Sequence, residues 1–178
     1  MNRLLFPPAN AKDHHRGDLT APMALVEYGD FECEDSLAAY LIVKQLQAKF
    51  GDKLVFVFRH FPLTDLKHIH PHAKQASVAC EIAAEYGKFW GMHDLLFENQ
   101  IHLEENDLAE MAVSLGIDKK EFLSKQKDPK YMKKVEKSYE NGLENGVHGT
   151  PTFFMNNVLY EGLITIDACP RSLESLKG

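Results

Sequence analysis

The thiol whose position most suggests chemistry is Cys33, which opens the run Cys33-Glu34-Asp35-Ser36. The residues before it are apolar and are expected to form a strand, and those after it are expected to form a helix. At such a junction the sulfur lies among the unpaired N–H groups at the positive end of the helix dipole, which favours the thiolate. The sequence therefore predicts a nucleophilic cysteine.

Four carboxylates crowd this cysteine and act against the thiolate. One carboxylate at about 6 Å disfavours a thiolate by roughly 1–3 kcal/mol, whereas a helix terminus contributes about 0.3–2 kcal/mol in the opposite direction. Because the two effects are similar in size, the balance between thiol and thiolate stays open. Acidic residues in a first helical turn also act simply as caps. The carboxylates are those of Asp30, Glu32, Glu34 and Asp35.

The hydrophobic pattern predicts the elements that position Cys33. Residues 24–28 and 54–58 are short apolar runs typical of strands, and residues 34–50 between them predict a largely buried helix. A strand–helix–strand unit of this length implies that the two strands are parallel.

A block of helices and a β-hairpin follow. Asn106 and Asp118 are expected to act as N-caps within the block, and Asn156-Asn157 to form a tight hairpin turn. The two β-containing ends are too short to stand alone, so they are expected to form one sheet with the helices inserted between them. Helices are expected over residues 73–86, 88–99, 106–115, 131–145 and 170–177, and strands over residues 152–155 and 158–160.

The composition excludes several classes of protein. Of the 178 residues, 44% are hydrophobic and 26% are charged, which argues against disorder. The formal charge of −6, without a basic run, makes nucleic acid or an anionic membrane an unexpected partner. Only a few apolar residues precede Pro7-Pro8, so we expect neither a signal peptide nor a membrane span, and a cytoplasmic location.

Several blocks of the sequence resemble, in order, the DsbA-like branch of the thioredoxin superfamily. The closest group is the cytoplasmic one described as similar to a domain fused to sodium/proton antiporters. The resemblance implies an α/β thioredoxin fold with a large inserted helical domain. The expected division is an arm over residues 1–20, a first thioredoxin half over 21–65, the helical domain over 66–145 and a second half over 146–178. The matching blocks are residues 25–33, 58–63, 70–73, 87–94 and 149–154.

The resemblance also implies roles for individual residues. Cys33 would be the nucleophile, Pro151 the cis-proline that faces it, and Thr150 the residue that presents its backbone to an extended substrate. Glu27 would be the acid buried behind the thiol. A carboxylate inside an apolar strand is costly unless it has a partner or a task, although Glu27 at a strand end that reaches water is the simpler alternative.

The sequence departs from the family's Cys-x-x-Cys motif, because Ser36 stands where the second cysteine is expected. Ser36 cannot close a disulfide, so two-cysteine chemistry is excluded unless Cys80 or Cys169 resolves it. Cys80 lies in an alanine-rich helix and is expected in the core. Ser36 remains a candidate hydrogen-bond donor to the Cys33 thiolate.

We therefore expect a thiol–disulfide oxidoreductase that acts through one thiol. Cys33 would attack a protein, peptide or glutathione disulfide, and a second thiol would release the mixed disulfide. No cofactor is expected, apart from glutathione as a candidate co-substrate. Two alternatives stay open: a non-catalytic module that binds extended peptide between Cys33 and Pro151, and a glutathione-using transferase or isomerase.

Histidines raise the separate question of a metal site. His60, His68, His70 and His72 lie close together in the sequence. Two of them belong to a block of the resemblance, and no cysteine or carboxylate completes a tetrahedral ligand spacing. The sequence therefore predicts no metal site.

Overall fold

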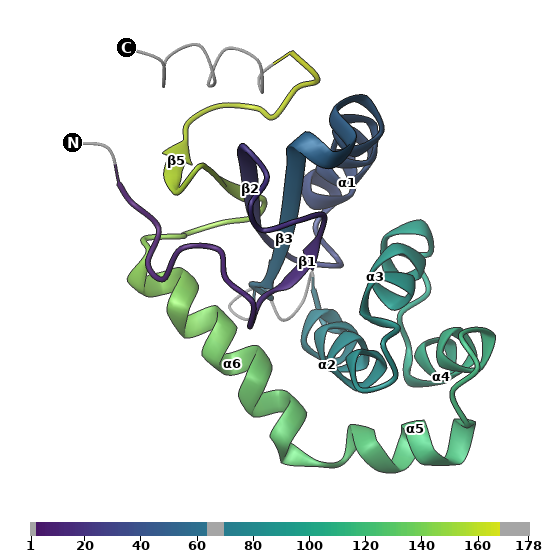
Figure 1. The fold of residues 1–178 in the computed structure, drawn as a ribbon. Helices are drawn as coiled ribbons and strands as arrows, with labels where there is room; N and C mark the ends of the chain where they lie inside the picture. Colours follow the sequence, from purple (N-terminus) through teal and green to yellow (C-terminus); the bar gives the residue numbers. More distant parts are fainter. Residues whose placement is uncertain (1–2, 64–69, 168–178) are drawn as a thin grey trace, which may run out of the picture.

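The structure, a computed structural model, describes residues 3–63 and 70–167 (Figure 1). The helix expected over residues 170–177, together with Cys169 and His68, lies outside this part of the chain. Five strands form one sheet in the order β1-β3-β2-β4-β5, in which β2 and β3 are parallel and the other pairs antiparallel. The strands are β1 (His14–Arg16), β2 (Met23–Gly29), β3 (Leu54–His60), β4 (Thr152–Met155) and β5 (Val158–Tyr160).

One long helix joins β2 to β3, and the part of the chain that the structure describes has five further helices between β3 and β4. This arrangement is a thioredoxin fold with a helical insertion, as the sequence predicted. A short 3₁₀ helix (Gly51–Lys53) ends the first connection. The α-helices are α1 (Glu34–Phe50), α2 (Ala73–Ala84), α3 (Phe89–Glu98), α4 (Glu105–Ser114), α5 (Lys119–Gln126) and α6 (Pro129–Glu144).

The sheet has a hydrophobic core on each face, because alternate residues of a strand point to opposite sides. Leu25 and Phe58 belong to the larger core, which includes residues of all six helices. Val26 and Phe154 belong to the smaller core, which Tyr139 of α6 helps to cover. In Figure 1, α1 and α3 lie to one side of the sheet, and α6 runs from the helical block toward the other.

The N-terminal arm, for which the sequence predicts no strand, is part of the sheet. β1 pairs with β3, and Leu4 forms a bridge with Val158 beside the opposite edge. Leu5 is buried, and Arg59 of β3 donates two hydrogen bonds of 2.9 Å to Asp13. The sequence did not reveal this strand because it is short and polar, and its partners in β3 lie forty or more positions away.

The caps of the inserted helices follow the sequence only in part. Asp118 caps α5 as predicted, by accepting a hydrogen bond of 2.9 Å from the backbone N–H of Glu121. The prediction for α4 was wrong, because Glu104 and not Asn106 is its N-cap. The Glu104 carboxylate accepts from the N–H of Asp107, whose carboxylate accepts from the N–H of Glu104. Two carboxylates thus form the reciprocal capping box usually built from a hydroxyl and a carboxylate.

The hairpin turn is confirmed at Asn156 and Asn157, which have φ values of 46° and 68°. Asparagine tolerates this left-handed region better than most residues. The side chain of Asn156 also accepts a hydrogen bond of 2.7 Å from the backbone N–H of Ala24, so the turn is fastened to β2. Over the described residues, none of the helices is both long enough and apolar enough to cross a membrane.

Candidate active site around Cys33

Cys33 is the N-cap residue of α1, at the turn that follows β2. The residue is 8% exposed, and its Sγ donates a hydrogen bond of 3.2 Å to the carbonyl oxygen of Thr150. It makes no side-chain cap hydrogen bond to the N–H groups of α1. A sulfur beside free N–H groups at a helix N-terminus is in an environment typical of nucleophilic thiols.

The turn before Cys33 is built around the buried carboxylate of Asp30. This carboxylate accepts hydrogen bonds of 2.8 Å from the backbone N–H of Glu32, from the backbone N–H of Leu63 and from Nδ1 of His70. Each carboxylate oxygen therefore has a donor. Asp30 is a structural anchor of the turn rather than a free charge facing the thiol.

The remaining acidic residues of the turn differ in their surroundings. Glu32 accepts a hydrogen bond of 2.7 Å from the backbone N–H of His72, and its second oxygen lies 3.0 Å from Nδ1 of the same histidine. Glu34 and Asp35 are exposed in the first turn of α1. Water screens these two carboxylates, which weakens their repulsion of a negative charge on Cys33. The expectation that four carboxylates act equally on the thiol therefore overstates the repulsion.

Gln100, just after α3, holds the turn from the side of the helical insertion. Its Nε2 donates hydrogen bonds of 2.9 Å and 3.0 Å to the carbonyl oxygens of Phe31 and Cys33. Sequence reasoning missed this residue, and no local pattern marks it. Its partners lie 67 and 69 positions away, so only the packing of α3 against the turn brings them together.

Glu27 is fully enclosed in the middle of β2, opposite Phe58 on one side and Phe153 on the other. Within the described structure its Oε1 has no hydrogen-bond partner. Burial raises the pKa of Glu27 to about 8, so the carboxyl is mostly protonated at neutral pH. The alternative in which Glu27 reaches water at the strand end is therefore wrong.

Ser36 lies in the first turn of α1 and is buried. Its Oγ accepts a long hydrogen bond of 3.4 Å from the backbone N–H of Asp30. Among the described residues, no hydrogen bond joins Ser36 to Cys33. A hydroxyl that accepts one bond still has a proton to donate, so the role of Ser36 as a donor to the thiolate stays a prediction.

The loop that faces Cys33 precedes β4. Its Thr150–Pro151 peptide bond is cis, and Thr152 donates a hydrogen bond of 2.7 Å from its hydroxyl to the carbonyl of Gly149. The structure thus brings Thr150 and Cys33 into contact, although 117 positions separate them. The side-chain hydroxyl of Thr150 is buried and has no partner in the described part of the chain.

Cys80 lies in the core of α2 and is fully buried, as predicted. Burial raises the pKa of its thiol well above the ordinary value. Such a thiol is neither accessible nor ionised, so Cys80 does not qualify as a resolving thiol for Cys33. Cys169 lies outside the described residues.

The histidines that lie close together in the sequence and within the described residues are found in two separate places. His70 and His72 stand beside the acidic turn, paired with Asp30 and Glu32. His60 lies elsewhere, with His14 and Glu81, in a group that sequence spacing did not suggest.

The sequence has relatives among curated proteins named as sodium/proton antiporters. It is 38% identical over 175 residues to "Na(+)/H(+) antiporter NhaA 1" of Mycolicibacterium vanbaalenii, a match that covers 97% of this chain and 28% of that protein. It is 39% identical over 153 residues to the NhaA antiporter of Herminiimonas arsenicoxydans, covering 85% of this chain and 24% of that protein. The chain thus spans about a quarter of the length of these relatives.

Solved structures show the same fold at lower identity. Oxidised BdbD from Bacillus subtilis superposes with a TM-score of 0.81 at 22% identity, covering 99% of this chain and 100% of that one. The thiol-disulfide exchange protein α-DsbA2 from Wolbachia pipientis superposes with a TM-score of 0.77 at 19% identity, covering 94% and 88%. At these identities the likeness shows the fold alone.

The family model described as thioredoxin matches residues 9–175, which is nearly the whole chain. This match agrees with the arrangement of strands and helices and with the DsbA-like neighbours. The resemblance drawn from the sequence is confirmed: the chain belongs to the thioredoxin family and has a DsbA-like fold.

Proposed function

We propose that the chain catalyses thiol–disulfide exchange on protein or peptide disulfides through the single thiol of Cys33. The observation that carries the proposal is the position of its Sγ, which lies at the N-terminus of α1 and contacts the carbonyl of Thr150. Membership of the thioredoxin family and the DsbA-like fold support the same reaction class.

The exchange proceeds in two displacement steps at sulfur, and each step forms one S–S bond and breaks one. The Cys33 thiolate attacks one sulfur of a substrate disulfide, forms a mixed disulfide with it and releases the other sulfur as a thiolate. A second thiol, for which glutathione is the candidate, then attacks the mixed disulfide and restores the Cys33 thiolate. The electrons pass from the second thiol to the substrate, so the protein needs no second cysteine and no cofactor.

The Thr150 carbonyl has a role in substrate binding under this proposal. It accepts a hydrogen bond from the Cys33 thiol, and ionisation of the thiol removes the proton that forms this bond. The carbonyl then becomes available to the backbone N–H of an extended peptide, as in recognition by strand addition. Glu27, held protonated by burial, is a candidate proton source for the leaving thiolate.

Exchange with glutathione disulfide tests the proposal directly. We expect mass spectrometry of the digested protein to find glutathione on Cys33, and we expect Cys33→Ala to reduce exchange with a disulfide peptide by at least about 100-fold. The matched control is Cys80→Ala, which removes a buried thiol and leaves exchange unchanged. Cys169→Ala is measured alongside, because a loss in that variant would reveal a resolving thiol. Full activity of Cys33→Ala would contradict the proposal.

The low exposure of the sulfur favours one alternative, a non-catalytic module that binds extended peptides. Cys33 is only 8% exposed as a residue, and its thiol already donates a hydrogen bond to Thr150, so its access to a disulfide is restricted. Cys33→Ser distinguishes the two functions: equal peptide affinity for the variant and the parent, together with negligible turnover of the parent, would favour the binding module. Saturable glutathione binding without exchange would instead favour a transferase or isomerase. The cytoplasmic location and the absence of nucleic-acid and membrane partners stay predictions.

A further inference from the structure

Two histidines and a glutamate converge at the junction between the sheet and the helical insertion, and their geometry points to a metal site. We infer that His14, His60 and Glu81 bind a divalent transition-metal ion such as Zn²⁺. One ligand atom from each residue lies within 4.8 Å of the other two. The site is independent of the thiol chemistry proposed for Cys33.

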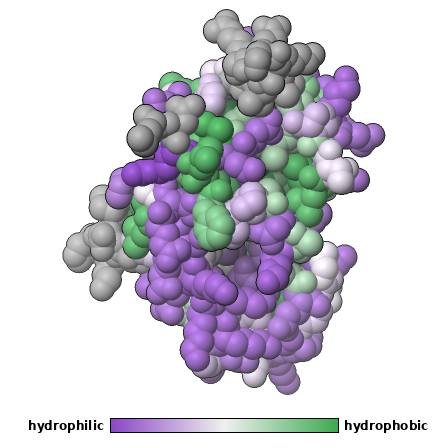
Figure 2. Space-filling view, turned by 60° about the vertical axis from the view of Figure 1, so that its left-hand side comes forward, coloured by the Kyte–Doolittle hydropathy of each residue, from purple (hydrophilic) through white to green (hydrophobic). Residues whose placement is uncertain are grey.

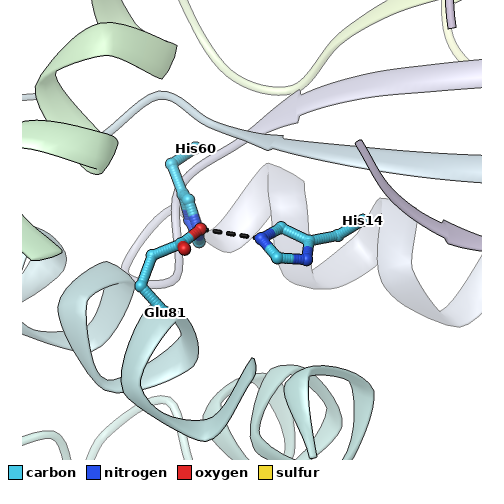
Figure 3. A group of neighbouring side chains, drawn as sticks. All are labelled: His14, His60 and Glu81. Atoms are coloured by element: carbon cyan, nitrogen blue, oxygen red, sulfur yellow. Dashed lines mark hydrogen bonds and ion pairs between the residues drawn. The ribbon is translucent and has the colours of Figure 1, made fainter. Parts of the chain in front are cut away.

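The three ligands come from three different elements (Figure 3). His14 belongs to β1, His60 ends β3, and Glu81 projects from α2. The Nε2 atoms of His14 and His60 lie 2.8 Å and 3.1 Å from the same oxygen, Oε1 of Glu81. Two imidazoles and one carboxylate form a donor set suited to Zn²⁺ and its neighbours in the first transition row.

The two spacings that involve Glu81 are close to what a tetrahedral ion requires, and the three ligand atoms all lie within 4.8 Å of one another. With metal–ligand distances of about 2.0–2.1 Å, neighbouring ligand atoms in a tetrahedral site lie about 3.3 Å apart. The two distances to Glu81 are therefore shorter than this by only a few tenths of an ångström. An ion that replaces the shared protons needs a small outward movement of the side chains. His14 is the partly exposed ligand and can supply it, whereas His60 and Glu81 are nearly enclosed.

The fourth coordination position opens toward solvent. The three residues line a cavity of about 470 Å³, which has room for water or a small anion as the remaining ligand. In Figure 2, hydrophilic residues surround a hollow on the face shown. A metal site with three protein ligands and one open position is the arrangement expected here.

Lys134 is expected to weaken the binding of a metal ion at this site. Its Nζ lies 3.3 Å from the second oxygen of Glu81, and it also lines the cavity. The ammonium group orients the carboxylate but repels a cation nearby. Removing this charge is therefore expected to tighten metal binding, which is the opposite of the effect of removing a ligand.

Zinc titration of the full chain carrying Cys33→Ser tests the site without competition from the active-site thiol. We expect one Zn²⁺ per chain by calorimetry and a rise in Tm on adding Zn²⁺, because the ion joins β1 and β3 to α2. His14→Gln should weaken the affinity by at least about tenfold and remove most of the rise in Tm. His15→Gln is the matched control, since the neighbouring ring bonds to the carbonyl of Gly17. It should leave both measurements unchanged.

Two further measurements separate the site from other ligands. Lys134→Gln should tighten binding, and Co²⁺ in place of Zn²⁺ should give the visible absorption of a tetrahedral ion without a sulfur charge-transfer band. Both results support the site. Absence of stoichiometric binding, or equal losses in His14→Gln and His15→Gln, would overturn it and leave a hydrogen-bonded triad. Because every variant carries Cys33→Ser, neither outcome depends on the exchange activity.

Discussion

At the scale of single residues, two equally buried acids differ in the hydrogen bonds that they accept. Glu27 lacks any partner for Oε1 among the described residues, so burial acts on it without compensation. Asp30 is as deeply buried but accepts three hydrogen bonds. Glu27 in the middle of β2 is therefore mostly protonated at neutral pH, whereas Asp30 holds the turn together through the hydrogen bonds that it accepts.

Glu27 should make stability depend on pH. Its pKa is 4.5 ordinarily and about 8 in the folded chain, so between these values the unfolded chain has released a proton that the folded chain retains. Stability contributed by the neutral form is complete below the lower value and falls as pH rises toward the upper one. In urea unfolding, the advantage of Glu27→Gln over the parent should grow by about 1.4 kcal/mol per pH unit within that window.

The control for this measurement is Gln45→Ala, which changes an exposed position of α1 without a titratable group. Its difference from the parent should stay nearly constant with pH. Parallel stability curves for Glu27→Gln and the parent would show that Glu27 is ionised in the folded chain.

At the scale of elements, close packing requires a glycine inside α6. A Cβ at Gly142 would lie 2.5 Å from Cδ2 of Phe61 and 3.1 Å from Cδ1 of Tyr28. Both rings belong to the smaller core, on the face of the sheet that α6 helps to cover. The helix approaches the sheet this closely because it has no side chain at that position.

Gly142→Ala should destabilise the protein even though alanine is the better helix former. We expect a loss of about 1–3 kcal/mol from overpacking, offset by about 1 kcal/mol of helix propensity. Gly91→Ala in α3 is the matched substitution, since its Cβ would meet mainly the flexible end of Leu115 at 2.8 Å. Urea unfolding should place Gly142→Ala below Gly91→Ala by at least about 1 kcal/mol. Equal stabilities would mean that α6 can move away without cost.

At the scale of the whole molecule, the helical insertion holds the turn that carries Cys33 in place. Gln100 reaches from the end of α3 to two carbonyls of the turn, and Arg16 of β1 pairs with Asp94 of α3 at 2.6 Å. The insertion is therefore coupled to the thiol through fixed hydrogen bonds. A change in how the insertion packs against the turn should therefore change the position of Cys33.

Gln100→Ala should loosen the turn without unfolding the chain. The Phe31 carbonyl loses the Gln100 donor, and the Cys33 carbonyl keeps only the N–H of Leu37, so we expect the free energy of unfolding to fall by about 1–3 kcal/mol. Hydrogen exchange of the amides in residues 31–36 should become faster, while exchange in the central strands changes only with the global stability. Gln45→Ala, at an exposed position of α1, is the control. Unchanged exchange at the turn would show that Gln100 does not restrain it.

The sequence predicted what local pattern encodes. The strands β2 to β5, α1, the hairpin at Asn156 and the buried Cys80 all follow from periodicity, turn residues and composition. Gln100 and the pairing of His14 with Glu81 did not, because they depend on how distant elements pack. β1 was missed for the same reason. The family resemblance alone led us to expect the loop of Thr150 and Pro151 to face Cys33, since nothing local joins the two segments. The hydrogen bond from Cys33 to the Thr150 carbonyl was not itself predicted.

The strand order also affects how the chain folds while it is being synthesised. β2 lies between β3, which follows it closely, and β4, whose hairpin contacts Ala24 through a residue 132 positions later. At roughly 5–20 residues per second, one edge of β2 waits on the order of ten seconds on the ribosome for its partner. Unpaired strand edges recruit other strands. Aggregation of the nascent chain is therefore the hazard that this topology creates, and it ends only when the β4–β5 hairpin arrives.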